Sequence, residues 1–376
     1  MNFDDIRPYT DEEVNEKIQR LVEEPQFQQV MEQVNPETPF KLLKMGMLRI
    51  HTIRDFQTKI IVPMLEKLIA QSTKGLSGKG LENLGPDKRY LFVSTHRDIA
   101  LDSALMDYIL LKGGHDTVEI AIGDNLMKIP WVVDLVKLNK TFIVKRSLSK
   151  DQKAAGSLEL SSYIHHALKE KKEAIWIAQK AGRSKDGNDR TNPSIIKMFN
   201  LGGDSEDVIE NLKSLNICPV SISYQYNPCD ILIMPELMTQ ANGEKYDKAP
   251  MEDLMQMAEG ITGNKGKVEV SFGKPINDEL DKLKGFKNIN ELNANIAALI
   301  DNQIHSTYSL MESNYIAYDL INDSNEFAKN YSEGDKTEFI EYMNSRLEKV
   351  EGDADFIKEV FQKMYAYPVR NWKEAQ

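Results

Sequence analysis

Cysteine and long apolar runs are both scarce in this sequence of 376 residues. The two cysteines, Cys218 and Cys229, form neither a disulfide framework nor a Cys-x-x-Cys metal knuckle, which favours a reducing compartment. No stretch approaches the ~18 uninterrupted apolar residues of a membrane-spanning helix. Acidic residues stand near the start, where a signal peptide has Lys or Arg followed by an apolar run. These absences predict a cytoplasmic protein.

Positive charge is in short supply as well. The chain has 47 Lys and Arg against 58 Asp and Glu, which gives a net charge of −11. This balance argues against broad nucleic-acid binding, because that function needs a basic surface. The shares of hydrophobic residues (41%) and charged residues (28%) are those of an ordinary globular protein. The length predicts about two domains, or one large domain with helical additions.

Several common catalytic motifs are missing. The chain has no phosphate-binding Gly-x-x-x-x-Gly-Lys loop, no Gly-x-Gly-x-x-Gly after a strand, no His-Glu-x-x-His and no Gly-x-Ser-x-Gly elbow. Nucleotide-driven, zinc-peptidase and serine-hydrolase functions therefore lose most of their support.

The hydrophobic pattern divides the chain into three parts. Residues 1–75 are predicted to be helical, because apolar residues between Phe40 and Ala70 recur at spacings of three and four, with a bend or division at Pro63. A Gly-rich connector over residues 75–80 marks a boundary. Residues 76–285 then alternate short β-rich runs with helical stretches, and residues 286–376 return to helix.

This alternation predicts an α/β fold, with a mixed, largely parallel sheet flanked by helices and with helical N-terminal and C-terminal additions. The predicted strands are Tyr90–Thr95, Thr117–Ile122, Thr141–Val144, Ala174–Ala178, Cys218–Tyr224 and Lys267–Phe272. The helices predicted between them are Asp102–Leu111, Lys150–Lys171 and Pro193–Phe199.

The N-terminal helical part contains a local excess of positive charge. Between residues 40 and 70 the acids are Asp55 and Glu66, whereas the basic residues are Lys41, Lys44, Arg49, Arg54, Lys59 and Lys67. One interpretation is a helical hairpin that packs on the α/β part. The other is a basic face that rests on anionic lipid or receives an acidic carrier protein.

A polar segment follows the first predicted strand of the α/β part. The strand runs into Ser-Thr-His-Arg-Asp, and a helix begins near Asp102. His96 is therefore expected at the carboxyl edge of the sheet, where open α/β folds build their sites. A neighbouring carboxylate, Asp98 or Asp102, would accept the Nδ1 proton and make Nε2 a general base. Because no nucleophilic Ser or Cys elbow accompanies it, this base would act on a hydroxyl of the substrate.

Two basic clusters stand at the ends of other predicted strands. One contains Lys145 and Arg146, and the other runs from Lys180 through Gly182 to Arg183 and Ser184. Arginines that arrive from neighbouring strand ends can bind phosphate oxygens in pairs. Together with His96, these clusters predict a pocket for a phosphorylated alcohol.

The order of these segments resembles the glycerol-phosphate acyltransferase superfamily, which includes the lysophosphatidate acyltransferases. The first family block is similar to His96 through Asp102, and the second is similar to Phe142–Arg146. The third is similar to Ala181-Gly182-Arg183-Ser184, and the fourth to residues 217–222. The resemblance covers roughly residues 85 to 280, and it is the ordered set of blocks that makes it specific.

The resemblance implies a fatty acyl transfer from an acyl-carrier-protein or coenzyme A thioester to glycerol-3-phosphate or lysophosphatidate, without a metal or another cofactor. His96 would be the base and Asp102 its partner, and backbone amides at the helix start would stabilise the oxyanion. Substrate binding would fall to Arg97, Lys145, Arg146, Lys180, Gly182, Arg183 and Ser184. The protein would meet the membrane peripherally, at its inner face.

The chain departs from the family pattern at two positions. Five residues separate His96 from Asp102 where the family has four, and Ala181 stands where the family has Glu. Either Asp186 or Asp189 supplies the missing carboxylate, or the activity is altered. Transfer to another lipid or amino-lipid hydroxyl, and a non-catalytic lipid- or carrier-binding role, are the alternative functions.

Overall fold

The centre of the molecule is a seven-stranded sheet in the order β1-β7-β6-β2-β5-β3-β4. The computed structural model describes residues 2–34, 36–127 and 129–376. Neighbouring strands are parallel except β6 and β7, which are antiparallel. The strands are β1 (Gly75–Lys79), β2 (Leu91–Ser94), β3 (Glu119–Gly123), β4 (Thr141–Val144), β5 (Ile175–Ala178), β6 (Ile217–Tyr224) and β7 (Lys267–Phe272). The predicted mixed, largely parallel α/β fold is confirmed.

The register brings three strand ends together. Ser94 at the end of β2 pairs with Ala178 on β5 and with Val220 on β6. Strand β6 continues to Tyr224, four residues beyond that level. The segments that follow β2 and β5 therefore leave the sheet side by side, and the end of β6 reaches past them.

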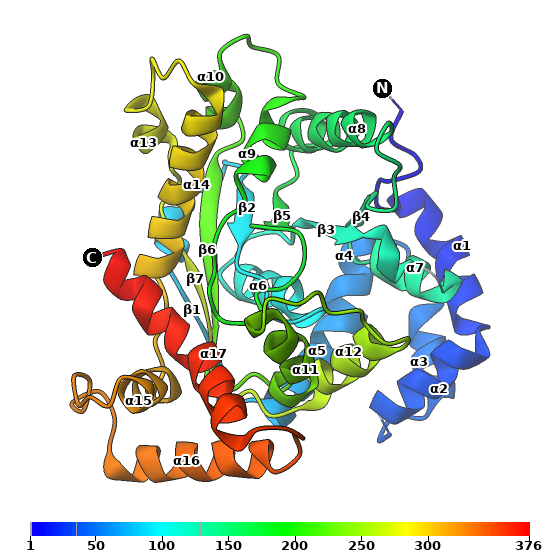
Figure 1. The fold of residues 1–376 in the computed structure, drawn as a ribbon. Helices are drawn as coiled ribbons and strands as arrows, with labels where there is room; N and C mark the ends of the chain where they lie inside the picture. Colours follow the sequence, from blue (N-terminus) through cyan, green and yellow to red (C-terminus); the bar gives the residue numbers. More distant parts are fainter. Residues whose placement is uncertain (1, 35, 128) are drawn as a thin grey trace.

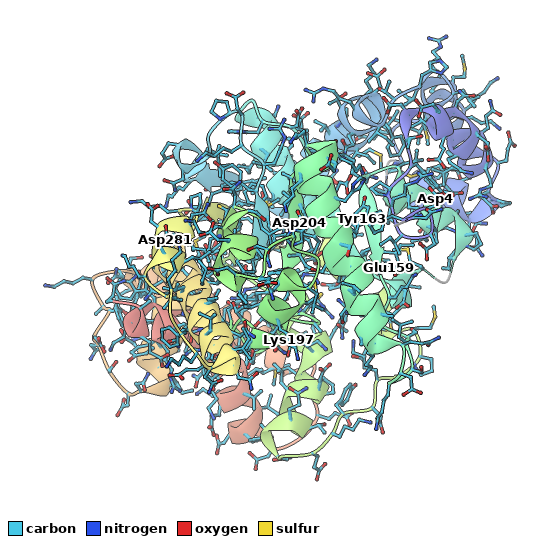
Figure 2. The ribbon with its side chains drawn as sticks, turned by 90° about the horizontal axis from the view of Figure 1, so that it is seen from above. Asp4, Glu159, Tyr163, Lys197, Asp204 and Asp281 are labelled. Carbon is cyan, nitrogen blue, oxygen red and sulfur yellow. The ribbon has the colours of Figure 1, made fainter. Side chains whose placement is uncertain are left out.

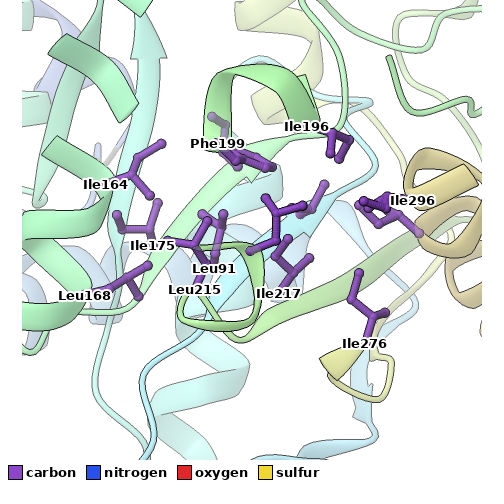
Figure 3. Packing of buried hydrophobic residues seen from close by; sticks show 14 of the residues in the cluster. Leu91, Ile164, Leu168, Ile175, Ile196, Phe199, Leu215, Ile217, Ile276 and Ile296 are labelled. Atoms are coloured by element: carbon purple, nitrogen blue, oxygen red, sulfur yellow. The ribbon is translucent and has the colours of Figure 1, made fainter. Parts of the chain in front are cut away.

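Helices cover both faces of the sheet. One face packs against α8 (Lys153–His166), α9 (Pro193–Asn200), α10 (Val208–Lys213) and α14 (Ile289–Ser306). Figure 3 shows this layer, in which Leu91, Ile175 and Ile217 from three strands meet Phe199 and Ile296 from the helices. The other face packs against α6 (Leu101–Lys112) and against α5 (Val62–Ser72). Because both faces are covered, β2 is buried along its whole length.

Two helical groups flank this core at opposite ends of the chain. The first joins α1 (Asp11–Val22), α2 (Pro25–Val34), α3 (Phe40–Met47) and α4 (Ile53–Phe56), and it also contacts α7 (Pro130–Lys137). The second joins α11 (Asp230–Ala241), α15 (Glu312–Ile321), α16 (Glu333–Leu347) and α17 (Ala354–Glu374). Figure 1 shows the first group in blue on one side of the sheet and α14 to α17, in yellow to red, on the other. The short helix α13 (Asn277–Asp281) precedes α14.

Three features differ from the sequence predictions. The Gly-rich connector is not a linker but strand β1, whose backbone pairs with β7. The division predicted at Pro63 is a π-helical turn, Gln57–Ile61, that ends just before it. Proline has no backbone N–H, so it cannot continue the regular hydrogen-bond ladder there. Finally, α11 and α12 (Glu252–Thr262) form a helical insertion between β6 and β7 that the sequence did not reveal.

Within the described part of the chain, every helix is too short or too polar to cross a lipid bilayer.

Candidate active site

His96 and Asp102 form a hydrogen-bonded pair where β2 gives way to α6. The His96 Nδ1 atom lies 2.9 Å from Oδ2 of Asp102, which stands in the first turn of α6. The same Oδ2 accepts the backbone N–H groups of Arg97 at 2.6 Å and Asp98 at 3.0 Å. The other oxygen, Oδ1, accepts the hydroxyl of Tyr224 from the end of β6 at 2.8 Å. Four donors therefore hold this buried carboxylate in one orientation.

This geometry prepares Nε2 of His96 to accept a proton. With the Nδ1–H group donating to Asp102, the lone pair of the neutral ring is on Nε2. The side chain is 17% exposed and lies on the wall of a groove, with its ring edge-on to Trp176 at a centroid distance of 5.6 Å. A hydroxyl bound in the groove can therefore meet an oriented base.

Asp98, the rival candidate for the partner of His96, has another role. Its Oδ1 accepts the backbone N–H groups of Ala100 at 2.9 Å and Leu101 at 2.7 Å, at the start of α6. Burial raises the pKa of Asp98, and the nearby charge of Asp102 raises it further. The amides of residues 97, 98, 100 and 101 thus all bind carboxylates, so these four are not available to stabilise an oxyanion.

The groove beside His96 is large and mostly apolar, with a volume of about 2250 Å³. Its walls come from the N-terminal helices α2 and α5, from α6, from β3, from α7 and from the insertion helix α12. Apolar side chains from these elements include Val30, Leu65, Leu68, Ala104, Leu111, Ile122, Val132, Leu254 and Ile261. A groove of this size and character can hold a long hydrocarbon chain.

Three of the predicted cations line the same groove. Arg146 lines the groove and lies across Gly123 of β3. A Cβ atom at position 123 would meet the Nε atom of Arg146 at 2.8 Å, so the glycine leaves the space that the arginine side chain occupies. Lys180 follows the end of β5. No carboxylate among the described residues pairs with Arg146 or Lys180. Both side chains therefore remain available for an anionic group.

Arg183 reaches the groove by way of a left-handed turn. Gly182 has a φ of +82°, a conformation that L side chains rarely adopt, and it also lines the groove. The Arg183 guanidinium donates to Oε1 of Gln256, a buried residue of α12. Gln256 is held in turn by Leu232 of α11 and by Glu252.

Arg97 does not lie in the groove, and its predicted substrate-binding role is corrected. Its guanidinium donates to Oδ2 of Asp189 at 2.5 Å and to the carbonyl of Ser184 at 3.2 Å. Burial opposes the charge, but Asp189 and Tyr308 raise the pKa of Arg97. His96 faces the groove, and Arg97 faces this buried network.

The predicted substrate-binding roles of Lys145 and Ser184 are also corrected, because neither side chain lines the groove. Lys145 Nζ lies 2.5 Å from Asp5 and 2.8 Å from Glu159. Glu159, labelled in Figure 2, belongs to helix α8. Its neighbour Arg146 takes the groove side. Ser184 is buried, its N–H donates to the carbonyl of His96 at 2.7 Å and its hydroxyl donates to the carbonyl of Asn188. Ser184 thus ties two loops together.

The α11–α12 insertion supplies contacts that the sequence did not indicate. Besides Gln256, it provides Glu236, which pairs with Lys185 on the groove wall. Burial lowers the pKa of Lys185, while the bond to Glu236 opposes that change. The segment Glu252–Thr262 has an ordinary amphipathic pattern, so no sequence signal marks Gln256. Tyr224 was detectable in principle, because it ends a predicted strand.

The place of the family glutamate remains without a carboxylate of its own. Ala181 is exposed and lines the groove. Asp189 is fully buried and engaged with Arg97 and Tyr308, so it cannot take that place. Asp186 does line the groove, and its Oδ1 accepts the N–H of Asn188 at 3.1 Å.

Metal chemistry has no obvious ligand set here: the residues that the structure describes include no group of three or more His, Cys, Asp or Glu side chains placed to hold an ion.

A His–Asp pair on the wall of a large apolar groove, with arginine and lysine beside it, is an arrangement suited to acyl transfer to a hydroxyl. A comparison with protein families agrees with this class. Residues 76–223 match the acyltransferase family. Residues 76–223 thus carry an acyltransferase-family domain, as the resemblance predicted.

Among solved structures, the chain is similar to the 1-acyl-sn-glycerophosphate (LPA) acyltransferase PlsC from Thermotoga maritima. The identity is 16% and the TM-score 0.34, over 76% of this chain and 92% of that chain. The comparison with curated proteins found no match.

Proposed function

We propose that this protein transfers a fatty acyl group from an acyl thioester to a hydroxyl of glycerol-3-phosphate or lysophosphatidate. The observation that carries the proposal is the position of the His96–Asp102 pair on the wall of the apolar groove that Arg146, Lys180 and Arg183 also line. The groove takes the acyl chain, and the cations take the phosphate of the acceptor.

Each step of the proposed reaction has a residue that carries it out. His96 Nε2 takes the proton of the acceptor hydroxyl while its oxygen attacks the thioester carbonyl. The negative charge of Asp102 stabilises the imidazolium that forms. When the carbon–sulfur bond breaks, the imidazolium returns the proton to the departing thiolate. The products are an ester and a free thiol, and no acyl-enzyme is required.

Release of free thiol that depends on added acceptor tests this function. Acyl-carrier-protein and coenzyme A thioesters are compared as donors, and glycerol-3-phosphate and lysophosphatidate as acceptors. We expect His96→Ala to abolish transfer while circular dichroism shows an intact fold. His51→Ala, on an exposed residue away from the groove, is the matched control. Normal turnover by the His96→Ala protein would refute the mechanism. Thiol release without dependence on any acceptor, or none at all, would favour a lipid- or carrier-binding role.

We also propose that the mouth of the groove meets a membrane surface peripherally, at the inner face of the cytoplasmic membrane. Five apolar side chains that line the groove are at the same time exposed: Val30, Val34, Ile129, Met251 and Leu254. The basic segment gives weaker support than its composition suggests, because Lys44, Arg54, Lys59 and Lys67 pair with carboxylates. The apolar rim is therefore the stronger support for contact with lipid.

Sedimentation with anionic vesicles tests this contact. We expect binding at low salt that falls when Met251 and Leu254 are both changed to Ser. Changing Leu42, an exposed apolar residue of α3 that does not line the groove, to Ser is the control. Failure of the wild-type protein to bind vesicles at low salt would refute the membrane proposal.

A further inference from the structure

One wall of the groove changes character along helix α6. Ala100, Ser103, Ala104, Asp107 and Leu111 all line it, at the spacings of three and four that define one helix face. Ala100 is next to the His96 loop, and Asp107 lies two turns further, about 10 Å along the axis. The wall thus begins with small side chains, which leave room for a chain, and then presents a carboxyl group.

Only one of the two oxygens of that carboxyl group has a hydrogen-bond partner among the described residues. Asp107 is 7% exposed, and its Oδ1 accepts the backbone N–H of Val118 at 3.0 Å. Its Oδ2 has no hydrogen-bond partner in the part of the chain that the structure describes. Burial raises the pKa of Asp107 to about 7, so near neutral pH a large share of these carboxyls carries a proton and can donate as well as accept.

A second polar group faces the groove from the N-terminal helices. Gln57 begins the π-helical turn, lines the groove and is 6% exposed. Its Oε1 accepts a hydrogen bond from the hydroxyl of Thr117 at 2.8 Å. Its amide nitrogen has no hydrogen-bond partner among the residues that the structure describes. Thr117 directly precedes Val118, the residue bound by Asp107, so the amide and the carboxyl gather around one short segment. Single π-helical turns occur frequently at functional sites.

Lys140, which donates to the carbonyl of Thr117 at 3.0 Å, lies close enough for its charge to act on Asp107, and the groove wall around the two polar groups also has apolar side chains. Ile61, Leu65, Leu68 and Ile120 line the groove with them. A plain hydrocarbon chain at this point would displace water and leave the Asp107 oxygen and the Gln57 amide without partners, which is costly. A hydroxyl group on the chain would instead accept from one of them and donate to the other.

We propose that this part of the groove binds an acyl chain that carries a hydroxyl in its middle, with Asp107 and Gln57 as the specificity-determining residues. The inference rests on the proposed acyl transfer. The distance of about two helical turns from the His96 loop places the hydroxyl well along the chain, away from the carbonyl group. The chain belongs either to the thioester donor or to the lysophosphatidate acceptor, and both present the same chemistry to the groove.

Competition between acyl chains tests the proposal. Stearoyl thioesters that are unsubstituted, hydroxylated next to the carbonyl group or hydroxylated in mid-chain are compared with glycerol-3-phosphate as the acceptor, which has no chain. A second arm uses the unsubstituted donor with lysophosphatidate whose chain is plain or hydroxylated in mid-chain. In one of the two arms we expect the mid-chain hydroxyl to raise kcat/KM about 10- to 100-fold, the effect of satisfying buried polar groups. Equal values for all chains in both arms would overturn the proposal.

Substitutions locate the effect. Gln57→Leu is expected to reduce the discrimination several-fold while the Asp107 bond to Val118 remains. Asp107→Asn keeps an acceptor for Val118 and a polar group toward the chain, so it should retain a preference, whereas Asp107→Leu should lose it. Gln19→Leu, on the exposed face of α1 outside the groove, is the matched control for Gln57→Leu. A preference that survives both Gln57→Leu and Asp107→Leu would refute the assignment.

A binding measurement separates this inference from the proposed function. Calorimetric titration of the wild-type protein with free mid-chain hydroxystearate and with stearate requires no turnover. An inactive protein that binds the hydroxylated acid more tightly, in a manner that depends on Gln57, would refute acyl transfer and support the site. An active protein that shows no such difference in binding or in kcat/KM would support acyl transfer and refute the proposed hydroxyl site.

Discussion

The Asp102 carboxylate offers the sharpest test of the site, because each of its hydrogen bonds has a different consequence. In Asp102→Asn, the amide oxygen can occupy the place of Oδ2, where it still accepts from Arg97, Asp98 and His96. The NH₂ group then takes the place of Oδ1 and donates to the oxygen of Tyr224, whose hydroxyl turns away. The two backbone N–H groups favour this orientation over its flip. The variant should therefore fold, and His96 should keep its tautomer.

What Asp102→Asn removes is the negative charge that stabilises the imidazolium. A hydrogen bond to a charged group contributes about 1.5 to 3 kcal/mol, so losing the charge should lower kcat about 10- to 150-fold. Asp102→Ala is different, because it leaves two backbone N–H groups and the Tyr224 hydroxyl unpaired in a buried position. At about 1 to 3 kcal/mol for each, we expect this variant to lose several kcal/mol of stability.

Steady-state rates with a saturating thioester donor, together with thermal unfolding, check both expectations. Asp98→Asn is the matched control, because among the described residues the Asp98 side chain binds backbone N–H groups alone and has no hydrogen bond to His96. A loss of more than about 1000-fold in folded Asp102→Asn would show that the His96 tautomer is not preserved. A rate equal to that of the wild type would refute Asp102 as the partner of the base.

The remaining predictions concern the acceptor, the missing glutamate and pH. Arg183→Ala should raise the acceptor KM about 10-fold or more, with a smaller change in kcat, and an unchanged KM would exclude phosphate binding by this residue. Ala181→Glu should raise the rate, because position 181 is exposed on the groove wall and Glu would add a carboxylate beside the acceptor. An unchanged rate would show that the hydrogen bond from Arg183 to Gln256 is enough to orient Arg183. The pKa of Asp107 is raised from 3.8 to about 7 by burial, so the contribution of Asp107 to stability should fall between about pH 4 and pH 7 and not further above it. Relative to wild type, Asp107→Asn should gain up to ~4 kcal/mol across that interval in urea unfolding, and parallel pH profiles would contradict this origin of the shift.

The strands and the helices next to them were predictable because their signals are local. Buried parallel strands are short apolar runs, and all six predicted strands, β2 to β7, lie within two residues of their predicted bounds. Strand β1 was not predictable, because Gly75–Lys79 has neither alternation nor an apolar run and is held by the backbone of β7. The insertion helices α11 and α12 were also missed, since their packing against distant helices is not encoded in a local pattern.

The placement of His96 and its partner followed from sequence for a similar reason. A strand that ends in polar residues before a helix brings them to one edge of the sheet, and Asp102 is close enough in the chain to return to His96. The assignments of Arg97, Lys145 and Ser184 failed because sequence shows that a charge is present but not which way it faces. Asp189, the partner of Arg97, is 92 residues away in the chain.

The sequence by itself determined the class of fold, the family and the pair of residues that can act as base and orienting acid. These properties depend on hydrophobic periodicity and on residues that are close in the chain. Only the tertiary structure decided which cations face the groove, that Gln256 holds Arg183, and that Asp107 and Gln57 gather around one segment of the groove. Those properties depend on burial and on contacts between distant elements, in which a change of one position turns a side chain from the groove into the core.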